Sequence, residues 1–259
     1  ICDLSSWRLA LNGAEPIAAG VLRRFGARFA PFGFDPAALR PVYGLSEAAL
    51  AVSFAPAGRP FASVARAGRE VVSVGAPLPG VAIEIRGADG EVLRADEEGR
   101  IFVRGPSLMR GYFGQDEETA RVLRGGWLDT GDLGFVREGM LYVSGRARDL
   151  IVLRGANHPP QLFEEALVGV EGVRPGCAVA VGWVPPDGAG EELVLLVETR
   201  GDCTGLADRV RAAVVAATGI RPAVVALLAP GTLPRTSSGK LRRAEALRRW
   251  LAGELAPPQ

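Results

Sequence analysis

The sequence contains few of the residues on which many catalytic and structural sites depend. Its 259 residues include three cysteines and one histidine. The cysteines are widely spaced and form no C-x-x-C pair, which gives little support to a zinc site or a disulfide framework; free thiols of a cytoplasmic protein are the simplest interpretation. A Ser-His-Asp or Cys-His mechanism would have to use His158, to which the sequence assigns no chemical role.

Other absences narrow the function further. No apolar run reaches the roughly 18 residues that span a bilayer, so no membrane span is expected. The formal net charge of +1 offers no electrostatic reason to bind nucleic acid or an anionic membrane surface. Because 48% of the residues are hydrophobic, the chain can bury a core of one large or two ordinary domains.

Three short motifs resemble known catalytic signatures but do not match them. The stretch "YGLSEAA" lacks the second glycine of a nucleophile elbow, and "LDTGDLG" supplies one Asp-Thr-Gly where an aspartic protease needs two. The stretch "LPRTSSGKLRR" is not a P-loop, because Gly231 is too far from Gly239 and Leu241 replaces the hydroxyl that binds magnesium. Hydrolases and P-loop enzymes are therefore disfavoured.

The apolar pattern predicts α/β structure followed by α+β structure. Residues 5–34 are typical of a strand, a turn and a helix, and residues 71–145 of a β-rich subdomain. After residue 146 we expect a helix at 163–170, strands at 177–184, 191–199 and 223–229, and an amphipathic helix at 206–219.

The last segment, "KLRRAEALRRWLAGEL", predicts a helix with one apolar face and one basic face. The apolar face would contain four residues: Leu241, Ala244, Leu247 and Leu251. Its arginines either form a solvated helix face or dock to an acidic partner, and the sequence leaves both open.

Five polar, glycine-punctuated clusters lie at predicted turns. In chain order they are "NGAEP" (12–16), "YGLSE" (43–47), "WLDTGDLG" (127–134), "GRARDLIVLRGANH" (145–158) and "LPRTSSGKLRR" (233–243). Each cluster alone is weak evidence, because such turns are common in proteins. In this order, however, they resemble the motifs of the adenylate-forming superfamily of acyl-CoA synthetases, luciferases and adenylation domains.

Within that superfamily, "DLSSWRLALNGAEP", "PVYGLSEAAL" and "GRARDLIVLRGANHPPQ" are most similar to fatty acyl-AMP ligases. The resemblance implies that residues 1–145 are the C-terminal part of the large domain, including the β-rich subdomain. Residues 146–259 would form a small, mobile α+β domain with a hinge near Asp149.

The resemblance also implies a role for each motif. Lys240 would contact the carboxylate and the α-phosphate during adenylation, and Glu47 would hold Mg²⁺. Nucleotide binding would involve Gly13, Ala14, Glu15, Tyr43, Gly44, Ser46, Asp132 and Arg146. Structural explanations stay open for several of these: Asp132 could cap a turn, Tyr43 could be a core residue, and Arg146 could be a surface charge.

The implied function is the ATP- and Mg²⁺-dependent activation of a fatty acid, with transfer to an acyl carrier protein or a polyketide or peptide synthase. The family's phosphate loop would lie upstream of residue 1, so we expect a C-terminal portion of a larger enzyme that is inactive alone. The short stretch "AVSFAPAGRPFASVARAGREVV" replaces a longer segment of fatty acyl-AMP ligases. A CoA ligase is therefore one alternative. A non-catalytic docking module is the other, which the expected absence of the N-terminal portion would support.

Overall fold

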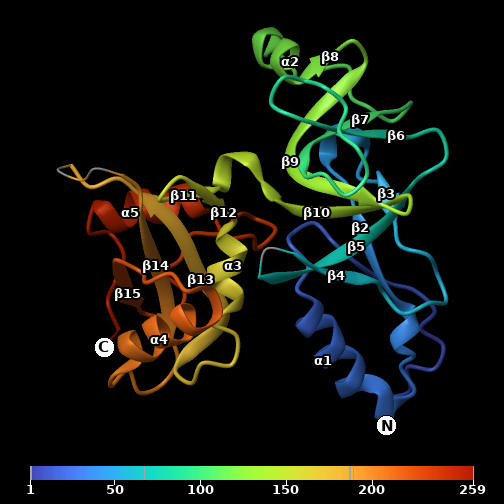
Figure 1. Cartoon of the computed structure of the whole chain (residues 1–259). Helices are drawn as coiled ribbons and strands as arrows, with labels where there is room; N and C mark the ends of the chain where they lie inside the picture. Colours follow the sequence, from blue (N-terminus) through green and yellow to red (C-terminus); the bar gives the residue numbers. More distant parts are fainter. Residues whose placement is uncertain (1, 67, 187, 189, 259) are drawn as a thin grey trace. The chain divides into compact units, whose positions relative to one another are not determined.

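The chain forms two compact units in a computed structural model that describes residues 2–66, 68–186, 188 and 190–258. The first unit is Ile1–Ala147 and the second is Arg148–Gln259. Figure 1 shows both units, with labels on most of their helices and strands.

The first unit begins with the predicted α/β element. Strand β1 (Ala10–Asn12) is followed by helix α1 (Ala19–Phe29) and then by strand β2 (Leu39–Tyr43). The two strands are parallel neighbours, with Ala10 opposite Leu39. Short 3-10 helices η1 (Ala30–Phe32) and η2 (Pro36–Ala38) connect α1 to β2. The parallel arrangement places the carboxyl ends of β1 and β2 at the same edge.

The remainder of the first unit is mostly antiparallel β structure. Its elements are η3 (Ser46–Ala48), β3 (Ser53–Phe54), β4 (Ser63–Arg66), β5 (Arg69–Pro77), β6 (Ala82–Arg86), β7 (Gly99–Arg104), α2 (Asp116–Val122), β8 (Leu123–Arg124), β9 (Trp127–Arg137), β10 (Met140–Arg146) and η4 (Ala147–Asp149), the last of which crosses into the second unit. The strands form one sheet of order β1-β2-β3-β5-β10-β9-β7-β6, with β4 beside β5 and β8 beside β9. The predicted β-rich subdomain is therefore present.

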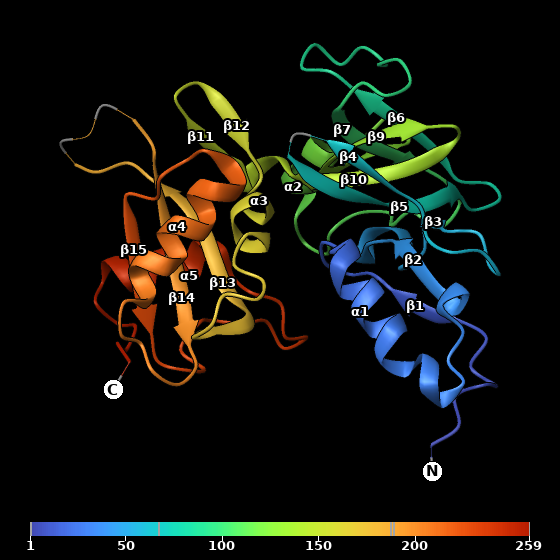
Figure 2. The ribbon, with the colours of Figure 1, turned by 60° about the horizontal axis from the view of Figure 1, so that its bottom comes forward.

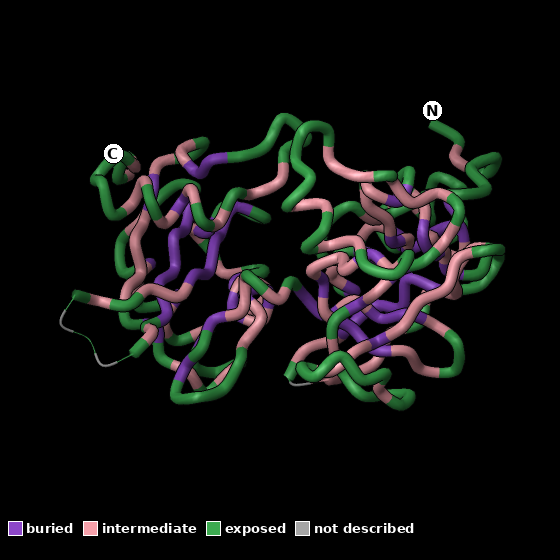
Figure 3. The backbone as a smooth tube through the Cα atoms, turned by 90° about the horizontal axis from the view of Figure 1, so that it is seen from above, coloured by how far each residue is buried: buried purple, intermediate pink, exposed green. Residues whose placement is uncertain are grey.

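The core of the first unit lies along the strands that continue the sheet from β2. One cluster of buried side chains includes Val52, Ile101 and Leu141, which are fully or almost fully removed from solvent. A second cluster packs α1 against β2 through Leu22 and Leu39. Figure 3 shows these buried stretches in purple. Burial of these apolar side chains fixes the strand ends that carry the polar motifs.

The second unit places helices on both faces of a three-stranded sheet. Its elements are β11 (Ile151–Leu153), β12 (Ala156–His158), α3 (Pro160–Glu165), β13 (Val173–Trp183), β14 (Glu192–Thr199), α4 (Leu206–Thr218), β15 (Val224–Leu228) and α5 (Arg243–Leu251). Strand β14 is central, antiparallel to β13 and parallel to β15. Leu193 and Leu195 of β14 pack with α3 and α4, whereas Val194 and Leu196 pack with α5 (Figure 2). Because β14 is buried on both faces, its sequence is a continuous apolar run rather than an alternating pattern.

Two predicted helices differ from the observed ones. The helix predicted at 163–170 is α3, which begins at Pro160 and ends at Glu165. The apolar face predicted for the last helix is wrong in part, because α5 starts only at Arg243 and buries Ala246. Leu251 is 52% exposed, because the helix buries a face one residue away from the predicted one.

Candidate active site

Two of the predicted nucleotide-binding glycines lie where a side chain would collide with backbone. Gly13 follows β1, and a Cβ atom there would lie 2.5 Å from the carbonyl oxygen of Val42. Gly44 follows β2, and a Cβ atom there would lie 1.3 Å from the carbonyl oxygen of Leu50. Both glycines therefore permit close backbone approach at the carboxyl ends of neighbouring parallel strands, where open α/β sheets bind ligands.

The residues next to these glycines are exposed. Ala14 has a left-handed backbone with φ of 72°, and its side chain and that of Glu15 face solvent. Ser46 is also exposed, at the start of η3. An exposed turn of this kind is accessible to a ligand.

Asp132 and Arg146 lie directly opposite each other in the β9–β10 hairpin. A two-residue turn at Glu138 and Gly139, both with positive φ, connects the strands. The regular register from this turn would place Gly145 opposite Asp132. The pairing shifts by one residue between Val143 and Gly145, and this bulge brings Arg146 into register with Asp132.

The carboxylate of Asp132 is held from two sides. Arg146 Nε donates to Oδ1 at 3.0 Å, and the hydroxyl of Tyr43 donates to Oδ2 at 2.7 Å. Asp132 is 7% exposed and Tyr43 is 9% exposed. Burial, followed by the negative charge of Asp132, raises the pKa of Tyr43 well above its usual range, so the phenol remains a donor. An ionised carboxylate is an acceptor only, and each of its oxygens can accept more than one hydrogen bond.

The other aspartate of "LDTGDLG" has a structural role. Asp129 accepts a hydrogen bond from the backbone N–H of Gly131 at 3.0 Å and pairs with Arg100 at 2.9 Å. These contacts stabilise the irregular part of β9 in which Gly131 takes a φ of 73°. Asp129 therefore shapes the backbone, and Asp132 is presented to Tyr43 and Arg146.

Glu47 has a partner that the sequence did not reveal. The hydroxyl of Tyr112 donates to Glu47 Oε1 at 2.8 Å, and the backbone N–H of Met109 donates to the Glu47 carbonyl at 2.7 Å. Burial and this hydrogen bond raise the pKa of Tyr112 to about 12. Because 65 residues separate Glu47 from Tyr112, no local pattern could have predicted the contact.

Lys240 closes a short loop in the second unit. Its backbone N–H donates to Thr236 Oγ1 at 3.0 Å, and the Thr236 N–H donates to the Lys240 carbonyl at 2.8 Å. Gly239 takes a φ of 88°, which the tight turn requires. Lys240 is also the only lysine in the sequence, since every other one of the 30 basic Lys and Arg residues is an arginine. This composition is a signal for Lys240 that needs no structure.

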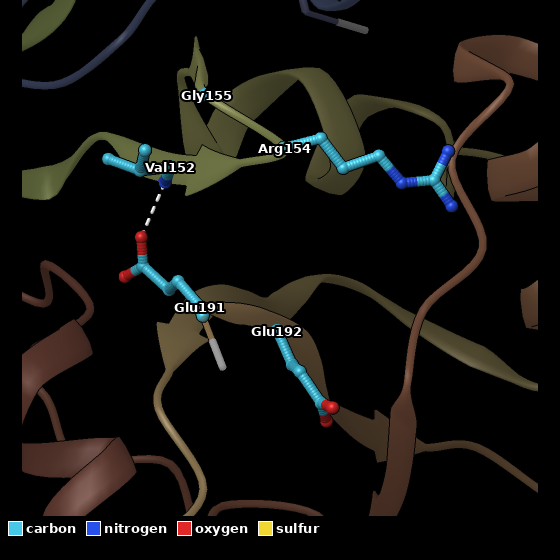
Figure 4. Close-up of a pocket in the computed structure, with 6 residues that line it drawn as sticks. Val152, Arg154, Gly155, Glu191 and Glu192 are labelled. Atoms are coloured by element: carbon cyan, nitrogen blue, oxygen red, sulfur yellow. Dashed lines mark hydrogen bonds between the residues drawn. The ribbon is translucent and has the colours of Figure 1, made fainter. Parts of the chain in front are cut away.

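Two other predicted positions lie in the second unit. Asp149 ends η4, and its carboxylate lies 3.6 Å from Arg243 Nη1. His158 ends β12, and the centroid of its ring lies 5.9 Å from that of Phe163. Figure 4 shows a surface hollow of the second unit, lined by residues that include Arg154, where Glu191 accepts the backbone N–H of Val152. The predicted site residues do not line it.

The fold and these motifs define the family. Residues 2–113 match the model of the AMP-binding enzymes, and the chain belongs to this adenylate-forming superfamily. A Caulobacter vibrioides protein, provisionally named an acyl-CoA synthetase, is 41% identical over 97% of this chain and 48% of its own length. A medium-chain-fatty-acid–[acyl-carrier-protein] ligase of Moorena producens is 34% identical over 98% of this chain and 48% of its own length.

A solved structure agrees with these relatives. It comes from a study of fatty acyl-adenylate ligases from E. coli and L. pneumophila, and it superposes with a TM-score of 0.86 at 36% identity. The match covers 97% of this chain and 48% of the solved one. The chain thus spans about half the length of the relatives it matches. None of the helices in the described part of the chain has the length and apolar content of a membrane span.

Proposed function

We propose that this chain takes part in the ATP-dependent activation of a fatty acid to its acyl-adenylate. Lys240 is the observation that carries the proposal. A chain that uses arginine at every other basic position has its one lysine in an ordered loop. None of the ion pairs found among the described residues includes the Lys240 ammonium. A compact, mobile ammonium suits contact with an anionic substrate better than a planar guanidinium does.

The reaction joins two anions. A carboxylate oxygen of the acid attacks the α-phosphorus of ATP, the bond from that phosphorus to the bridging oxygen of the β-phosphate breaks, and pyrophosphate leaves. The protein must position the two reactants and neutralise their charge. Lys240 would supply positive charge to the carboxylate and the α-phosphate during this step.

Asp132 and the residues around it in the first unit would bind the nucleoside. Asp132 would accept hydrogen bonds from the ribose hydroxyls, because an ionised carboxylate is an acceptor only. Tyr43 and Arg146 hold that carboxylate in place. Gly13 and Gly44 would let the backbone approach the nucleotide closely.

Magnesium would bind in the first unit through Glu47. Among the described residues there is no group of three or more His, Cys, Asp and Glu side chains that could hold a metal ion. A single carboxylate nevertheless fits Mg²⁺ in a nucleotide enzyme, because the phosphates and water complete its coordination. The hydrogen bond from Tyr112 occupies Oε1 of Glu47 and fixes the orientation of the carboxylate. The ion would neutralise phosphate charge, and Ser46 would contact a phosphate.

The second half-reaction would transfer the acyl group to a thiol. The thiol sulfur would attack the acyl carbonyl and lose its proton to solvent, the bond from the carbonyl carbon to the phosphate oxygen would break, and AMP would leave. A movement of the second unit about Asp149 would exchange one half-reaction for the other. The Moorena producens relative favours an acyl carrier protein as the acceptor, whereas the Caulobacter vibrioides relative favours CoA.

The test uses the longest natural polypeptide that contains this chain. We expect fatty-acid-dependent ATP–pyrophosphate exchange, which Lys240→Ala lowers by at least about a hundredfold and Lys240→Arg does not restore. Arg242→Gln, two residues away in an exposed position, is the matched control and should retain the exchange activity. Thioester formation with carrier protein or CoA then identifies the acceptor.

The outcomes separate the candidate functions. Exchange that persists in Lys240→Ala would refute the role of the lysine. A folded polypeptide that exchanges with no carboxylic acid would refute the ligase function and favour a docking module.

A further inference from the structure

Three charged side chains connect the first segment of the second unit to the segment that carries Lys240. Asp149 ends η4, next to the boundary between the two units. Glu164 lies in α3, and Arg243 is the first residue of α5. Arg243 follows Lys240 by three residues, and the proposed adenylation chemistry does not use it.

Arg243 binds both carboxylates. Its Nε donates to Glu164 Oε1 at 3.0 Å and its Nη2 donates to Glu164 Oε2 at 2.7 Å, which is a bidentate pair. Its Nη1 lies 3.6 Å from Asp149 Oδ2. The side chains of Arg243, Glu164 and Asp149 are 18%, 15% and 21% exposed. A planar guanidinium paired in this way fixes orientation as well as distance.

Glu164 is itself anchored to the sheet. Its Oε1 also accepts the backbone N–H of Ala180 in β13 at 3.1 Å. The start of α5 is therefore tied through Arg243 and Glu164 to the most buried strands of the unit. Removing the guanidinium would leave two neighbouring carboxylates without it in a partly buried position, which disfavours the observed arrangement.

The connection continues from Arg243 back to Lys240. The backbone N–H of Arg242 donates to the carbonyl of Pro234 at 2.9 Å, and Leu241 forms an isolated β-bridge with Arg235. These contacts leave little freedom between the start of α5 and the lysine loop. The position of the Lys240 backbone is consequently set relative to Asp149.

We propose that Arg243 is a positioning residue that couples the boundary between the two units to Lys240. The proposal rests on the proposed function, in that Lys240 acts in adenylation. A movement about the boundary delivers Lys240 to a reproducible place only if the boundary segment and the lysine loop move as one rigid body. Small displacements of a catalytic group carry large losses in rate.

Hydrogen–deuterium exchange of the 259-residue chain tests the anchoring without any activity. In Arg243→Gln, amides of residues 235–243 should exchange about tenfold faster than in the wild type. Arg242→Gln is the matched control, because Arg242 is adjacent and exposed. Strand β14 reports whether the unit stays folded, and its exchange should not change. Equal exchange of residues 235–243 in wild type and Arg243→Gln would overturn the proposal.

A second variant covers general unfolding. If β14 also exchanges faster in Arg243→Gln, the experiment uses Asp149→Asn as the test variant instead. This substitution removes one charge and keeps the ion pair between Arg243 and Glu164. The Asp149→Asn variant should speed exchange at residues 235–243 several-fold with β14 unchanged. Exchange at the wild-type rate in this variant would equally overturn the coupling to the boundary.

Kinetics of the longer natural polypeptide test the consequence. Arg243→Gln should lower kcat for pyrophosphate exchange by about tenfold to a hundredfold, with KM for ATP within about threefold and Arg242→Gln close to wild type. Acyl transfer from a supplied acyl-adenylate, which does not need Lys240, should persist. A wild type without exchange refutes the proposed function and this role with it, whereas an active wild type matched by Arg243→Gln refutes the positioning role alone.

Discussion

The substitution Tyr43→Phe removes one oxygen atom from the centre of the candidate nucleotide site. The Tyr43 hydroxyl donates to Asp132 Oδ2 at 2.7 Å, and both residues are buried. Phenylalanine keeps the ring, so the apolar packing of Tyr43 with Val52 and Val74 is preserved. The change therefore isolates the hydrogen bond.

The magnitude follows from the charge of the acceptor. A hydrogen bond to a charged group contributes about 1.5–3 kcal/mol, more than a neutral pair, because a buried carboxylate loses solvation that it does not regain. Arg146 remains on the other oxygen, so we expect a loss of about 2 kcal/mol from the free energy of unfolding of the first unit. With a urea m-value near 2 kcal/mol/M, the midpoint falls by about 1 M.

The assay must report on one unit, because the two units can unfold separately. Trp7 and Trp127 lie in the first unit, and Trp183 and Trp250 lie in the second. Urea unfolding followed by tryptophan fluorescence in a Trp183→Phe, Trp250→Phe background therefore follows the first unit.

Tyr142→Phe is the matched control for this measurement. Tyr142 is 5% exposed and stacks on Phe135 at 4.9 Å, and its hydroxyl forms no hydrogen bond with the described residues. We expect its midpoint to change by less than about half of the Tyr43→Phe shift. Equal midpoints for the two variants would refute the claim that the phenol of Tyr43 holds Asp132.

Three further substitutions test the structure away from the site. Gly75→Ala should destabilise the first unit by at least about 2 kcal/mol in urea unfolding, because φ is 85° and the new Cβ would lie 1.9 Å from the Phe54 carbonyl oxygen. Gly139→Ala, with a φ of 74° and open space, should cost only about 1 kcal/mol, and equal losses would contradict the collision. Burial raises the pKa of Glu198, but backbone hydrogen bonds and Arg174 outweigh burial and lower the pKa below 4.5. The ionised Glu198 carboxylate contributes fully to the free energy of unfolding above pH 4.5, and this contribution is lost as the pH falls through the lowered pKa. Glu198→Gln should therefore reduce the thermal midpoint at pH 7 and weaken the decline of the midpoint towards pH 3. An unchanged decline would refute this explanation.

Sequence patterns alone predicted the elements that build this protein. Alternation and apolar runs predicted the β-rich subdomain, and the run "EELVLLVET" predicted β14 because a fully buried strand needs apolar residues on both faces. The five motifs in order predicted the superfamily, which the comparisons confirm. Their assignment to binding roles stays a prediction, as do the domain roles and the hinge at Asp149.

Long-range contacts were beyond reach of the sequence. The pairing of Tyr112 with Glu47 and of Arg243 with Glu164 joins residues 65 and 79 positions apart. A hydrogen bond between distant residues depends on how several elements pack together, and no periodicity encodes it. The shifted face of α5 has the same origin, because the observed start of the helix at Arg243 coincides with a tertiary ion pair.

The β9–β10 hairpin shows most clearly which features the sequence determined and which the tertiary structure decided. The turn at Glu138 and Gly139 is a local signal that determines the β9–β10 hairpin, and regular pairing from it places Gly145 opposite Asp132. Only the bulge at Ser144 brings Arg146 to that position. The Ser144 carbonyl accepts a hydrogen bond from Arg69 Nη1 at 2.6 Å, 75 residues earlier in the chain. The sequence determined which residues form the hairpin, and tertiary packing decided which side chain faces the aspartate, because the extra residue of the bulge is unpaired in the ladder and its carbonyl is bound by a side chain from another strand.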